Sequence, residues 1–428
     1  MREFSTELVT LGQIDAALSP AAADVARMQV AVDGIVARVR AEGDAAVLEY
    51  VRKFDWPEAE LPLLKVTEAE FQVALSEVDA ELMTAMTVAA EHIRNYHQRQ
   101  LPENFFEELE RGLRVGQRHT PVESVACYVP TGKASIPSSL LMSVVPAQVA
   151  GVPRIVVVGP SLRDGSMPAG VLVAAHLLGI TDIYKLGSAW ALAALAFGTP
   201  SFPKVDKIVG PTSMYGSLAK KALFGEVGID GLYGPSEVVI IADGSVNPAW
   251  VAADLLSQSE HGEDSQSVLI SPDAAYLAAV KVEIAAQLAA SPRAKYLEVS
   301  LRERGALVLT RDLNEAVEMA NVLAAEHLEL AVADPEALLP LIKHAGSILM
   351  GAYTPVPVGD YLAGPSHILP TGRTARFSSG LGVTDFLKRS SLVKVTPEWL
   401  RENRPTIATL ATHEGLAAHA DTVARRVE

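Results

Sequence analysis

The sequence predicts an α/β protein with parallel sheets in more than one domain. Short β-rich runs alternate with Ala- and Leu-rich helical segments, at 125–129, 155–158, 183–186 and 207–209. A second series of expected strands and helices follows this one along the chain. At 428 residues the chain is too long for one ordinary core, so we expect two or three domains.

The N-terminal quarter is expected to be a helical scaffold, because apolar residues recur near helical spacing between about residues 20 and 100. The second α/β series has expected strands at 238–242, 267–270 and 306–309, and expected helices at 250–257 and 315–325. After about Leu381 the tail carries two prolines and then a helical run at 414–419. Such an appendage often packs on a neighbouring subunit.

The composition limits the classes of function. With 36 basic and 51 acidic residues, the net charge of −15 argues against a general nucleic-acid binder and favours a small-molecule ligand. The single cysteine, Cys127, excludes an intramolecular disulfide, and the first residues lack a secretory signal, so we expect a cytoplasmic protein. No apolar stretch reaches the roughly 20 residues that a membrane span requires, so no membrane contact is expected.

Gln258 and His261 stand three residues apart at the end of an expected helix, a spacing that places both side chains on one face. Taken alone, the pair is better interpreted as a histidine-capped helix end. If Asp360 and His419 join them, two imidazoles, a carboxylate and an amide oxygen form a donor set that suits zinc. Spacing alone does not establish that grouping.

Glu326 and His327 lie between an expected helix and a probable strand, where adjacent side chains point different ways and can serve separate proton transfers. A plain polar helix end is an equally good interpretation. The loop at 359–367 contains Asp360 and His367 between glycines and a proline, which is typical of a rigid loop that presents groups to a pocket. Ser236 precedes an expected strand, where a simple turn is the better interpretation.

Several common catalytic motifs are absent from the sequence. No G-x-G-x-x-G fingerprint opens a helix after a strand, and there is no P-loop, no G-x-S-x-G elbow and no H-E-x-x-H. Cys127 stands in an apolar run and is interpreted as a core residue. Dinucleotide binding of the standard kind is therefore not visible.

As an ordered set, ten segments resemble histidinol dehydrogenases, the enzymes of the last two steps of histidine biosynthesis, over nearly the whole chain. The segments are Tyr128-Val129-Pro130, Pro137-Ser138-Ser139-Leu140-Leu141-Met142, Val205-Asp206-Lys207-Ile208-Val209-Gly210-Pro211, Gly228-Ile229-Asp230, Gly234-Pro235-Ser236-Glu237, Gln258-Ser259-Glu260-His261, Ala325-Glu326-His327-Leu328, Gly359-Asp360-Tyr361, His367-Ile368-Leu369-Pro370-Thr371 and Glu414-Gly415-Leu416.

The resemblance implies a fold with two similar parallel-sheet domains of incomplete Rossmann character and small helical segments at both ends. The implied divisions are an N-terminal segment (1–20), an α/β domain with most zinc and catalytic residues (21–124 with 237–380), an α/β domain implicated in NAD binding (125–236), and a tail (381–428). In the family this tail reaches the partner's site, so a homodimer is implied.

The resemblance also implies roles for individual residues. One zinc per subunit would be held by Gln258, His261, Asp360 and His419, and it would anchor L-histidinol. Ser236, His327, His367 and Glu414 would contact the substrate together with these ligands. His327 would take the proton of the alcohol as hydride leaves for NAD, and Glu326 would activate water for the second oxidation.

Of the three usual NAD contacts in the family, only Tyr128 is retained. Trp190 stands where family members carry glutamine, and Ser213 stands where they carry asparagine. Trp190 could stack on a ring of the cofactor or could fill its space, and we favour stacking.

Three other functions remain open at this point. A paralogue could oxidise another polar alcohol, as sulfopropanediol dehydrogenases do, although retention of Ser236, His367 and Glu414 favours histidinol. A zinc hydrolase could use Glu326 to activate metal-bound water. A metal-holding protein could have lost catalysis through its altered cofactor region.

Overall fold

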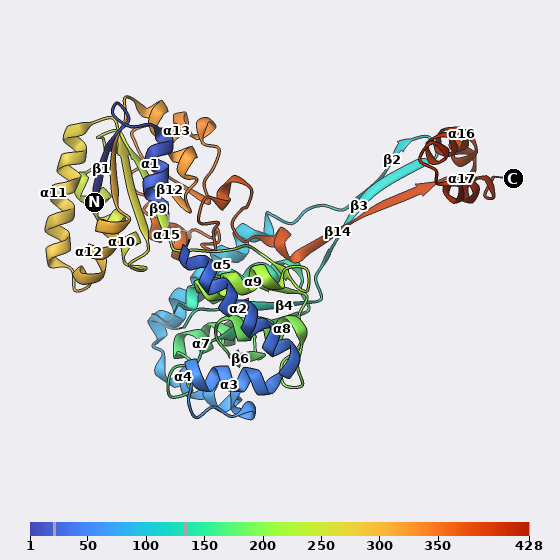
Figure 1. The fold of residues 1–428 in the computed structure, drawn as a ribbon, viewed down its shortest axis with the longest axis horizontal. Coiled ribbons are helices and arrows are strands. Elements are labelled where there is room, and N and C mark those ends of the chain that lie inside the picture. Colours follow the sequence, from blue (N-terminus) through green and yellow to red (C-terminus); the bar gives the residue numbers. More distant parts are fainter. Residues whose placement is uncertain (20–22, 132–135, 428) are drawn as a thin grey trace.

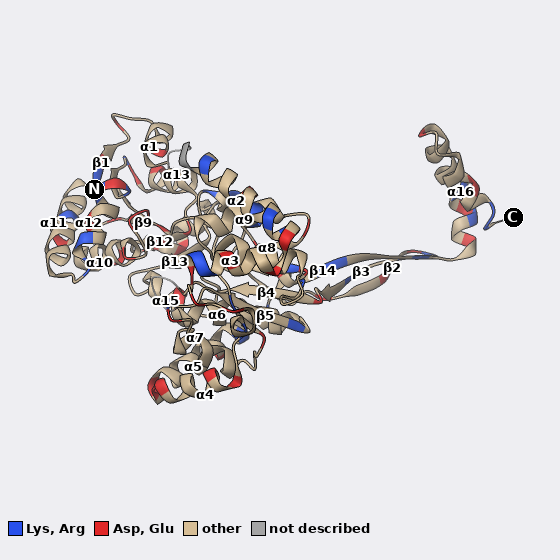
Figure 2. Ribbon diagram, turned by 60° about the horizontal axis from the view of Figure 1, so that its bottom comes forward, with Lys and Arg blue, Asp and Glu red and all other residues tan. Residues whose placement is uncertain are grey.

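The computed structural model describes residues 1–19, 23–131 and 136–427, and it confirms an α/β fold with two parallel sheets. Figure 1 shows two α/β units side by side and an arm that carries the C-terminus away from both. In Figure 2, basic and acidic residues are interspersed over the two units. No helix in the described part of the chain is long and apolar enough to cross a membrane.

The first unit is built on a six-stranded sheet in which every neighbouring pair is parallel. Its spatial order is β1 (Arg2–Ser5), β11 (Ala306–Leu309), β10 (Gln266–Ser271), β9 (Glu237–Ala242), β12 (His327–Ala331) and β13 (Ser347–Met350). The inner strands are mostly buried because helices cover both faces, and apolar residues of these strands belong to the cores on the two faces.

Helices of this unit form two layers. One face is covered by α10 (Pro248–Ser259), α11 (Ala274–Ala290) and α12 (Ala294–Glu303), with α15 (Val356–Tyr361) at its edge. The other face is covered by α1 (Leu11–Leu18), α13 (Leu313–Leu323) and α14 (Pro335–Leu338). Short 3₁₀ turns lie at η2 (Leu339–Leu341) and η3 (Thr374–Arg376).

The second unit is built on a five-stranded parallel sheet. Its spatial order is β6 (Ile183–Lys185), β5 (Arg154–Gly159), β4 (Ser124–Tyr128), β7 (Lys207–Val209) and β8 (Gly228–Ile229). If β1 is left out and the strands of each sheet are numbered from 1 to 5 along the chain, both sheets have the same spatial order, 3-2-1-4-5. This is the Rossmann order without its sixth strand, so the expected pair of similar, incomplete Rossmann-like sheets is confirmed.

Eight helices among the described residues enclose the five-stranded sheet. One face carries α4 (Glu68–Glu77), α5 (Ala80–Gln98), α6 (Pro137–Ala150) and α7 (Ala169–Leu177). The other carries α2 (Ala23–Glu42), α3 (Asp44–Phe54), α8 (Ser188–Phe197) and α9 (Met214–Leu223). Two 3₁₀ turns, η1 (Leu61–Leu64) and η4 (Val383–Phe386), adjoin this unit.

The packing of the N-terminal helices corrects the expected domain grouping. Residues 21–124 were expected to join 237–380, but Val32 and Val47 pack against the five-stranded sheet on one face, and Phe71 and Ile93 pack against it on the other. In the N-terminal segment, residues 1–19 instead join the six-stranded sheet through β1 and α1. Helical periodicity shows that a helix buries one face, but it does not show which sheet covers that face.

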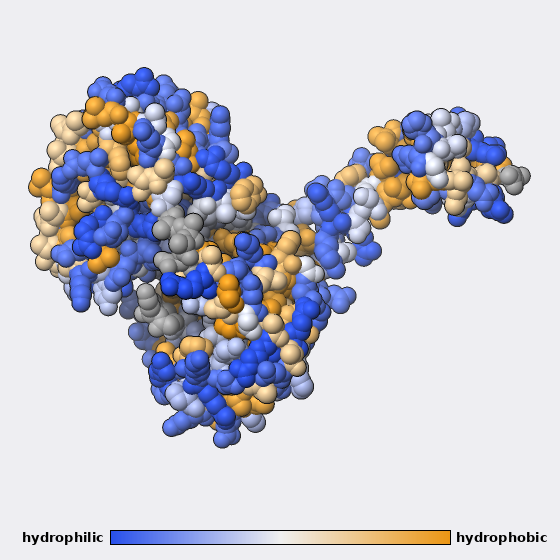
Figure 3. Space-filling view, viewed as in Figure 1, coloured by the Kyte–Doolittle hydropathy of each residue, from blue (hydrophilic) through white to orange (hydrophobic). Residues whose placement is uncertain are grey.

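The arm is a feature that the sequence analysis missed. Three antiparallel strands form it, in the order β14 (Leu387–Val395), β3 (Leu113–Pro121) and β2 (Phe105–Glu110), and its tip carries α16 (Pro397–His413) and α17 (Ala417–Ala424). Figure 3 shows this tip standing clear of the body. The tail expected at 381–428 is therefore joined to residues 105–121 by strand pairing, a long-range contact that local sequence patterns do not reveal.

Candidate active site

Glu326 and His327 lie at the amino end of β12, beside Glu237 at the amino end of β9. The preceding helix α13 ends at Leu323, and Ala324 adopts a left-handed conformation with φ of 46° that turns the chain into the strand. Glu326 and His327 are only 7% and 5% exposed. The pair is therefore positioned by the two neighbouring strands at the centre of the sheet.

The backbone of Glu237 orients both side chains. Its N–H donates to Oε2 of Glu326 at 2.9 Å, and its carbonyl oxygen lies 3.2 Å from Nδ1 of His327. A carbonyl oxygen only accepts, so Nδ1 carries the proton in this contact. Nε2 of His327 is buried, has no hydrogen-bond partner among the described residues and lies 3.4 Å from Oδ1 of Asp360. This nitrogen is the one available for proton transfer.

Burial shifts the acidity of the pair. It raises the pKa of Glu326 to about 7, while the neighbouring His327 acts in the opposite direction. Burial lowers the pKa of His327, but the negative charges of Glu326 and Asp360 outweigh it, and the pKa of His327 is raised to about 9. Both groups therefore exchange protons near neutral or mildly basic pH.

Asp360 and His367 bring the two units together. The backbone carbonyl of Asp360 accepts from Nδ1 of His367 at 2.9 Å, so Nε2 of His367 is free to accept from Oγ of Ser139 at 3.1 Å. Ser139 lies in the first turn of α6, which belongs to the five-stranded unit. A cavity of about 130 Å³ beside this contact is lined in part by His327, Asp360 and His367.

Gln258 has the most unusual environment of the expected ligands. Gln258 is 1% exposed, and both its Oε1 and Nε2 are buried with no hydrogen-bond partner in the part of the chain that the structure describes. Burying an amide without partners is costly, so an unpaired buried amide is typical of a residue that contacts a ligand. It stands in the last turn of α10, on the helix face that packs against the sheet.

His261 corrects one detail of the sequence analysis, since α10 ends at Ser259 and His261 lies in the following turn rather than on the helix. Its backbone N–H still donates to the carbonyl of Gln258 at 3.3 Å. Part of the His261 side chain is open to solvent, yet enough protein surrounds the imidazole that burial lowers its pKa, against the effect of Asp360. His261 and Asp360 are thus electrostatic neighbours.

The structure does not bring the whole expected site together in one chain. Glu414, at the end of α16, and His419, on α17, are exposed, and Figure 1 shows these two helices at the tip of the arm, away from β12. Within the described residues, no three His, Cys, Asp or Glu side chains are grouped closely enough to hold a metal. Ser236 is half-buried just before β9, and its carbonyl accepts from the N–H of Gln266 at 2.9 Å.

The donor set nevertheless fits zinc. The unpaired amide of Gln258, the imidazole of His261 and the carboxylate of Asp360 are nitrogen and oxygen donors of the kind that zinc binds. Gln258 would contribute an amide oxygen, so it is not one of the His, Cys, Asp or Glu side chains considered above. The fourth expected ligand, His419, lies on the arm. Within one chain the expected ligand set is therefore incomplete.

The expected NAD contacts lie at or near the carboxyl edge of the five-stranded sheet. Tyr128 ends β4, and its hydroxyl accepts from the N–H of Ser188 at 3.0 Å. Ser213 follows β7 and caps α9 by accepting from the N–H of Gly216 at 3.4 Å. The gap between β4 and β7 is where the strand order reverses, and dinucleotides bind at such switch points in open α/β sheets.

Trp190 does not have the position expected of a ring stacked on NAD. Its indole is 5% exposed and packs on Tyr50 and Phe54, with centroid distances of 5.7 and 5.3 Å and nearly parallel rings. These contacts join α8 to α3 in the core of the second unit. This environment favours a packing role for Trp190 over the expected cofactor contact.

Two residues of the site were not singled out from the sequence. Glu237 orients Glu326 and His327 through its backbone, and burial raises the pKa of its side chain to about 7. Ser139 holds His367 from the other unit. Both stood inside segments that carried the family resemblance, which was the only available signal.

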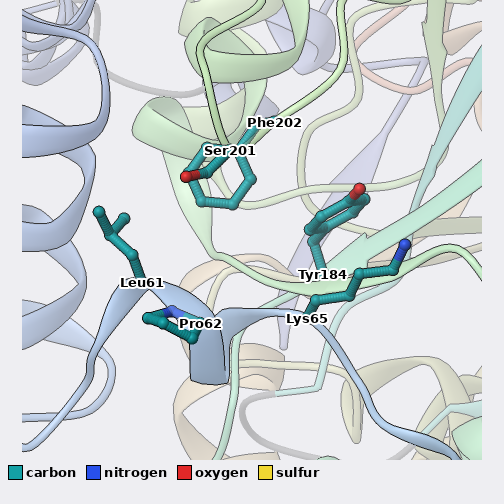
Figure 4. Close-up of a pocket in the computed structure, with 6 residues that line it drawn as sticks. All are labelled: Leu61, Pro62, Lys65, Tyr184, Ser201 and Phe202. Atoms are coloured by element: carbon teal, nitrogen blue, oxygen red, sulfur yellow. The ribbon is translucent and has the colours of Figure 1, made fainter.

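A second cavity, of about 260 Å³, lies at the outer edge of the five-stranded sheet and is lined by Leu61, Pro62, Lys65, Tyr184, Ser201 and Phe202 (Figure 4). Its one cation, Lys65, already pairs with Asp182 at 2.8 Å. It holds none of the expected catalytic residues.

Comparisons with known proteins agree on one family. The sequence model of the family described as histidinol dehydrogenase matches residues 19–427. Histidinol dehydrogenase of Halalkalibacterium halodurans is 48% identical over 400 residues, which is 94% of both chains, and that of Bacillus subtilis is 48% identical over 395 residues, or 92% of each. The crystal structure of histidinol dehydrogenase from Elizabethkingia anophelis matches with a TM-score of 0.90 at 32% identity, covering 100% of this chain and 98% of the other.

Proposed function

The chain belongs to the histidinol dehydrogenase family, and on that premise we propose that it oxidises L-histidinol to L-histidine in two NAD-dependent steps through bound L-histidinaldehyde. The buried Glu326 and His327 pair beside Asp360 is the observation that supports this most directly. The names of the relatives favour histidinol over another polar alcohol, and they do not favour a hydrolase.

His327 is the base of the first step in this proposal. Nδ1 donates to the carbonyl of Glu237, so the imidazole keeps one orientation and its Nε2 accepts the proton of the alcohol while hydride passes to NAD. Coordination of Asp360 to a cation would weaken the negative charge that raises the pKa of His327, which moves that pKa back toward the range of an effective base. The first step yields the aldehyde, NADH and one proton.

Glu326 is the base of the second step. Water must add to the aldehyde before a second hydride can leave, and a carboxylate with a pKa of about 7 can take a proton from that water. The N–H of Glu237 holds one oxygen of Glu326 in place. The hydrate then loses hydride to a second NAD, and the products are the carboxylate, NADH and two protons.

Zinc is proposed as the metal, held by Gln258, His261 and Asp360 from one subunit and by His419 from another. A zinc ion held there would supply an anchor for the substrate, so that the aldehyde would be retained between the two steps. His367 and Ser236 line the substrate side in this proposal, and Glu414 joins them from the arm. His367 is kept in one orientation by Ser139 and by the carbonyl of Asp360.

A homodimer with exchanged arms is proposed because the site is incomplete within one chain. The arm places Glu414 and His419 in solvent, and it also exposes large apolar residues, namely Leu109, Val393, Leu410 and Leu416. Apolar surface of this kind on an extended arm favours contact with another copy of the chain. We place the enzyme in the cytoplasm, where a lone buried cysteine such as Cys127 stays reduced.

The stoichiometry of NADH tests the proposal. The purified enzyme with excess NAD should form about two NADH for each L-histidinol consumed, in line with two hydride transfers. Dialysis against a chelator should abolish turnover, and added zinc should restore it. His261→Asn, which removes a proposed zinc ligand, should likewise lose turnover, and Glu260→Gln is its matched control because Glu260 is an exposed neighbour. One NADH for each histidinol, or no reaction in the zinc-loaded enzyme, would refute the proposal.

A further inference from the structure

A fully buried ion pair lies beneath the switch point of the five-stranded sheet, outside the group of catalytic residues described above. Nζ of Lys220, on α9, lies 2.7 Å from Oδ1 of Asp230, which follows β8. The two side chains are 0% and 1% exposed. Buried pairs of this kind add little stability compared with apolar residues of similar size, so their retention calls for another explanation.

Both members of the pair hold the same residue, Gly210. Oδ2 of Asp230 accepts from the N–H of Gly210 at 2.7 Å, and Nζ of Lys220 donates to the carbonyl oxygen of Gly210 at 2.6 Å. Asp230 also accepts from the N–H of Gly231 at 2.8 Å, and the ammonium group lies 4.9 Å from the ring centroid of Tyr233. The pair thus bonds both the N–H and the carbonyl oxygen of Gly210.

Gly210 is held in a conformation that few other residues adopt. Its φ is 108°, and a Cβ at this position would overlap the carbonyl oxygen of Tyr128 at the end of β4. Gly210 directly follows β7 and begins the loop that ends at Ser213, the cap of α9. The ion pair therefore fixes the backbone conformation directly after β7, at the carboxyl ends of β4 and β7.

We propose that Lys220 and Asp230 are positioning residues for NAD: by clamping Gly210 they hold the loop at 210–213 in the conformation that receives the cofactor. The inference rests on the proposed function, because that function places NAD at this switch point. Neither side chain reaches the cofactor itself, since both are buried beneath the loop. Their effect is on NAD affinity and not on the chemistry of histidinol.

Lys220→Met tests the proposal, with Lys185→Met as its matched control. Lys185 is also a buried lysine of this sheet, 2.7 Å from Glu70, but it stands at the edge strand β6 and does not contact the loop. Calorimetric titration of zinc-loaded enzyme with NAD measures affinity without turnover. Loss of charged hydrogen bonds that hold the loop should weaken NAD binding about tenfold or more in Lys220→Met.

The remaining measurements separate positioning from general stability. The KM for histidinol and the zinc content should change less than about twofold in Lys220→Met, because the ion pair does not contact that part of the site. Lys185→Met should lower the thermal midpoint without weakening NAD binding. Unchanged NAD affinity in Lys220→Met, or an equal loss in Lys185→Met, overturns the proposal.

If Lys220→Met does not fold, the double variant Lys220→Met plus Asp230→Asn leaves no unpaired buried charge and gives the same readout. Weakened NAD binding in the folded double variant supports the clamp, and unchanged binding overturns it. Failure of the proposed function is a separate result, because the unaltered enzyme would then show no binding of NAD.

Discussion

Nε2 of His327 lies 3.4 Å from Oδ1 of Asp360 and has no hydrogen-bond partner in the described structure, while Nδ1 of the same ring is directed to the carbonyl of Glu237. Nδ1 thus fixes the orientation of the imidazole, and Nε2 is available for proton transfer. A proposed metal ligand and the proposed base are adjacent, so the substrate alcohol can be held within reach of both.

Replacing His327 with glutamine should lower kcat by about 10²–10⁴-fold, because the alcohol loses its proton acceptor. Zinc content should be retained, since His327 is not among the proposed ligands. Steady-state kinetics and metal analysis measure both effects. His344→Gln is the control, being a half-buried histidine after η2 and outside the site. Loss of zinc together with activity would instead make His327 a ligand.

Glu326→Gln should block the second oxidation while the first continues. Glutamine retains an oxygen that can accept from the N–H of Glu237, so the local structure should persist, but it cannot take a proton from water. NADH formed for each histidinol should fall from two toward one, with aldehyde detected by a trapping reagent. Equal slowing of oxidation from histidinol and from added histidinaldehyde would contradict the assigned role.

Gln258→Met should separate metal binding from stability. The substitution has similar volume and removes two buried polar atoms that have no partner within residues 1–19, 23–131 and 136–427, so the metal-free protein should be no less stable to urea. Zinc bound per subunit should fall sharply because a ligand is lost. A large loss of stability in the metal-free variant would show that Gln258 has a structural partner.

Exchange of arms can be tested by mixing two inactive variants. His261→Asn alters the body and His419→Asn alters the arm, so a mixed dimer with exchanged arms has one intact site. Random reassembly of equal amounts should restore about a quarter of the activity of the unaltered enzyme. If each arm served its own subunit, no site in the mixture would be intact and no activity would return.

Buried Glu329, beside half-buried Asp254, predicts a dependence of stability on pH. Burial, with a smaller contribution from Asp254, raises the pKa of Glu329 to about 9. Between the ordinary pKa of about 4.3 and about 9, the folded chain holds a proton that the unfolded chain has released, so stability falls as pH rises.

Glu329→Gln removes this ionisation and can still donate a hydrogen bond to Asp254. Its urea midpoint, compared with that of the unaltered protein, should therefore improve progressively between about pH 5 and about pH 8. Glu298→Gln, an exposed substitution on α12, serves as the control. A difference between variant and parent that stays constant with pH would contradict the prediction.

The sequence determined the α/β class and most inner strands, since the apolar runs of buried parallel strands are a local property of the chain. It also marked Glu326, His327 and Asp360 as candidates, and the ordered resemblance assigned their roles. The segments around them are recognisable one at a time, in the way that short motifs are.

Only the tertiary structure decided which distant parts meet. In the folded chain α2–α5 pack on the five-stranded sheet, and β14 pairs with β3 in the arm. Trp190 stacks with Tyr50 and Phe54, and Lys220 and Asp230 both bond to Gly210. These are contacts between residues far apart in sequence, whose geometry depends on the packing of whole elements. Local periodicity predicts that one face of an element is buried. Only the tertiary structure shows which other element covers that face.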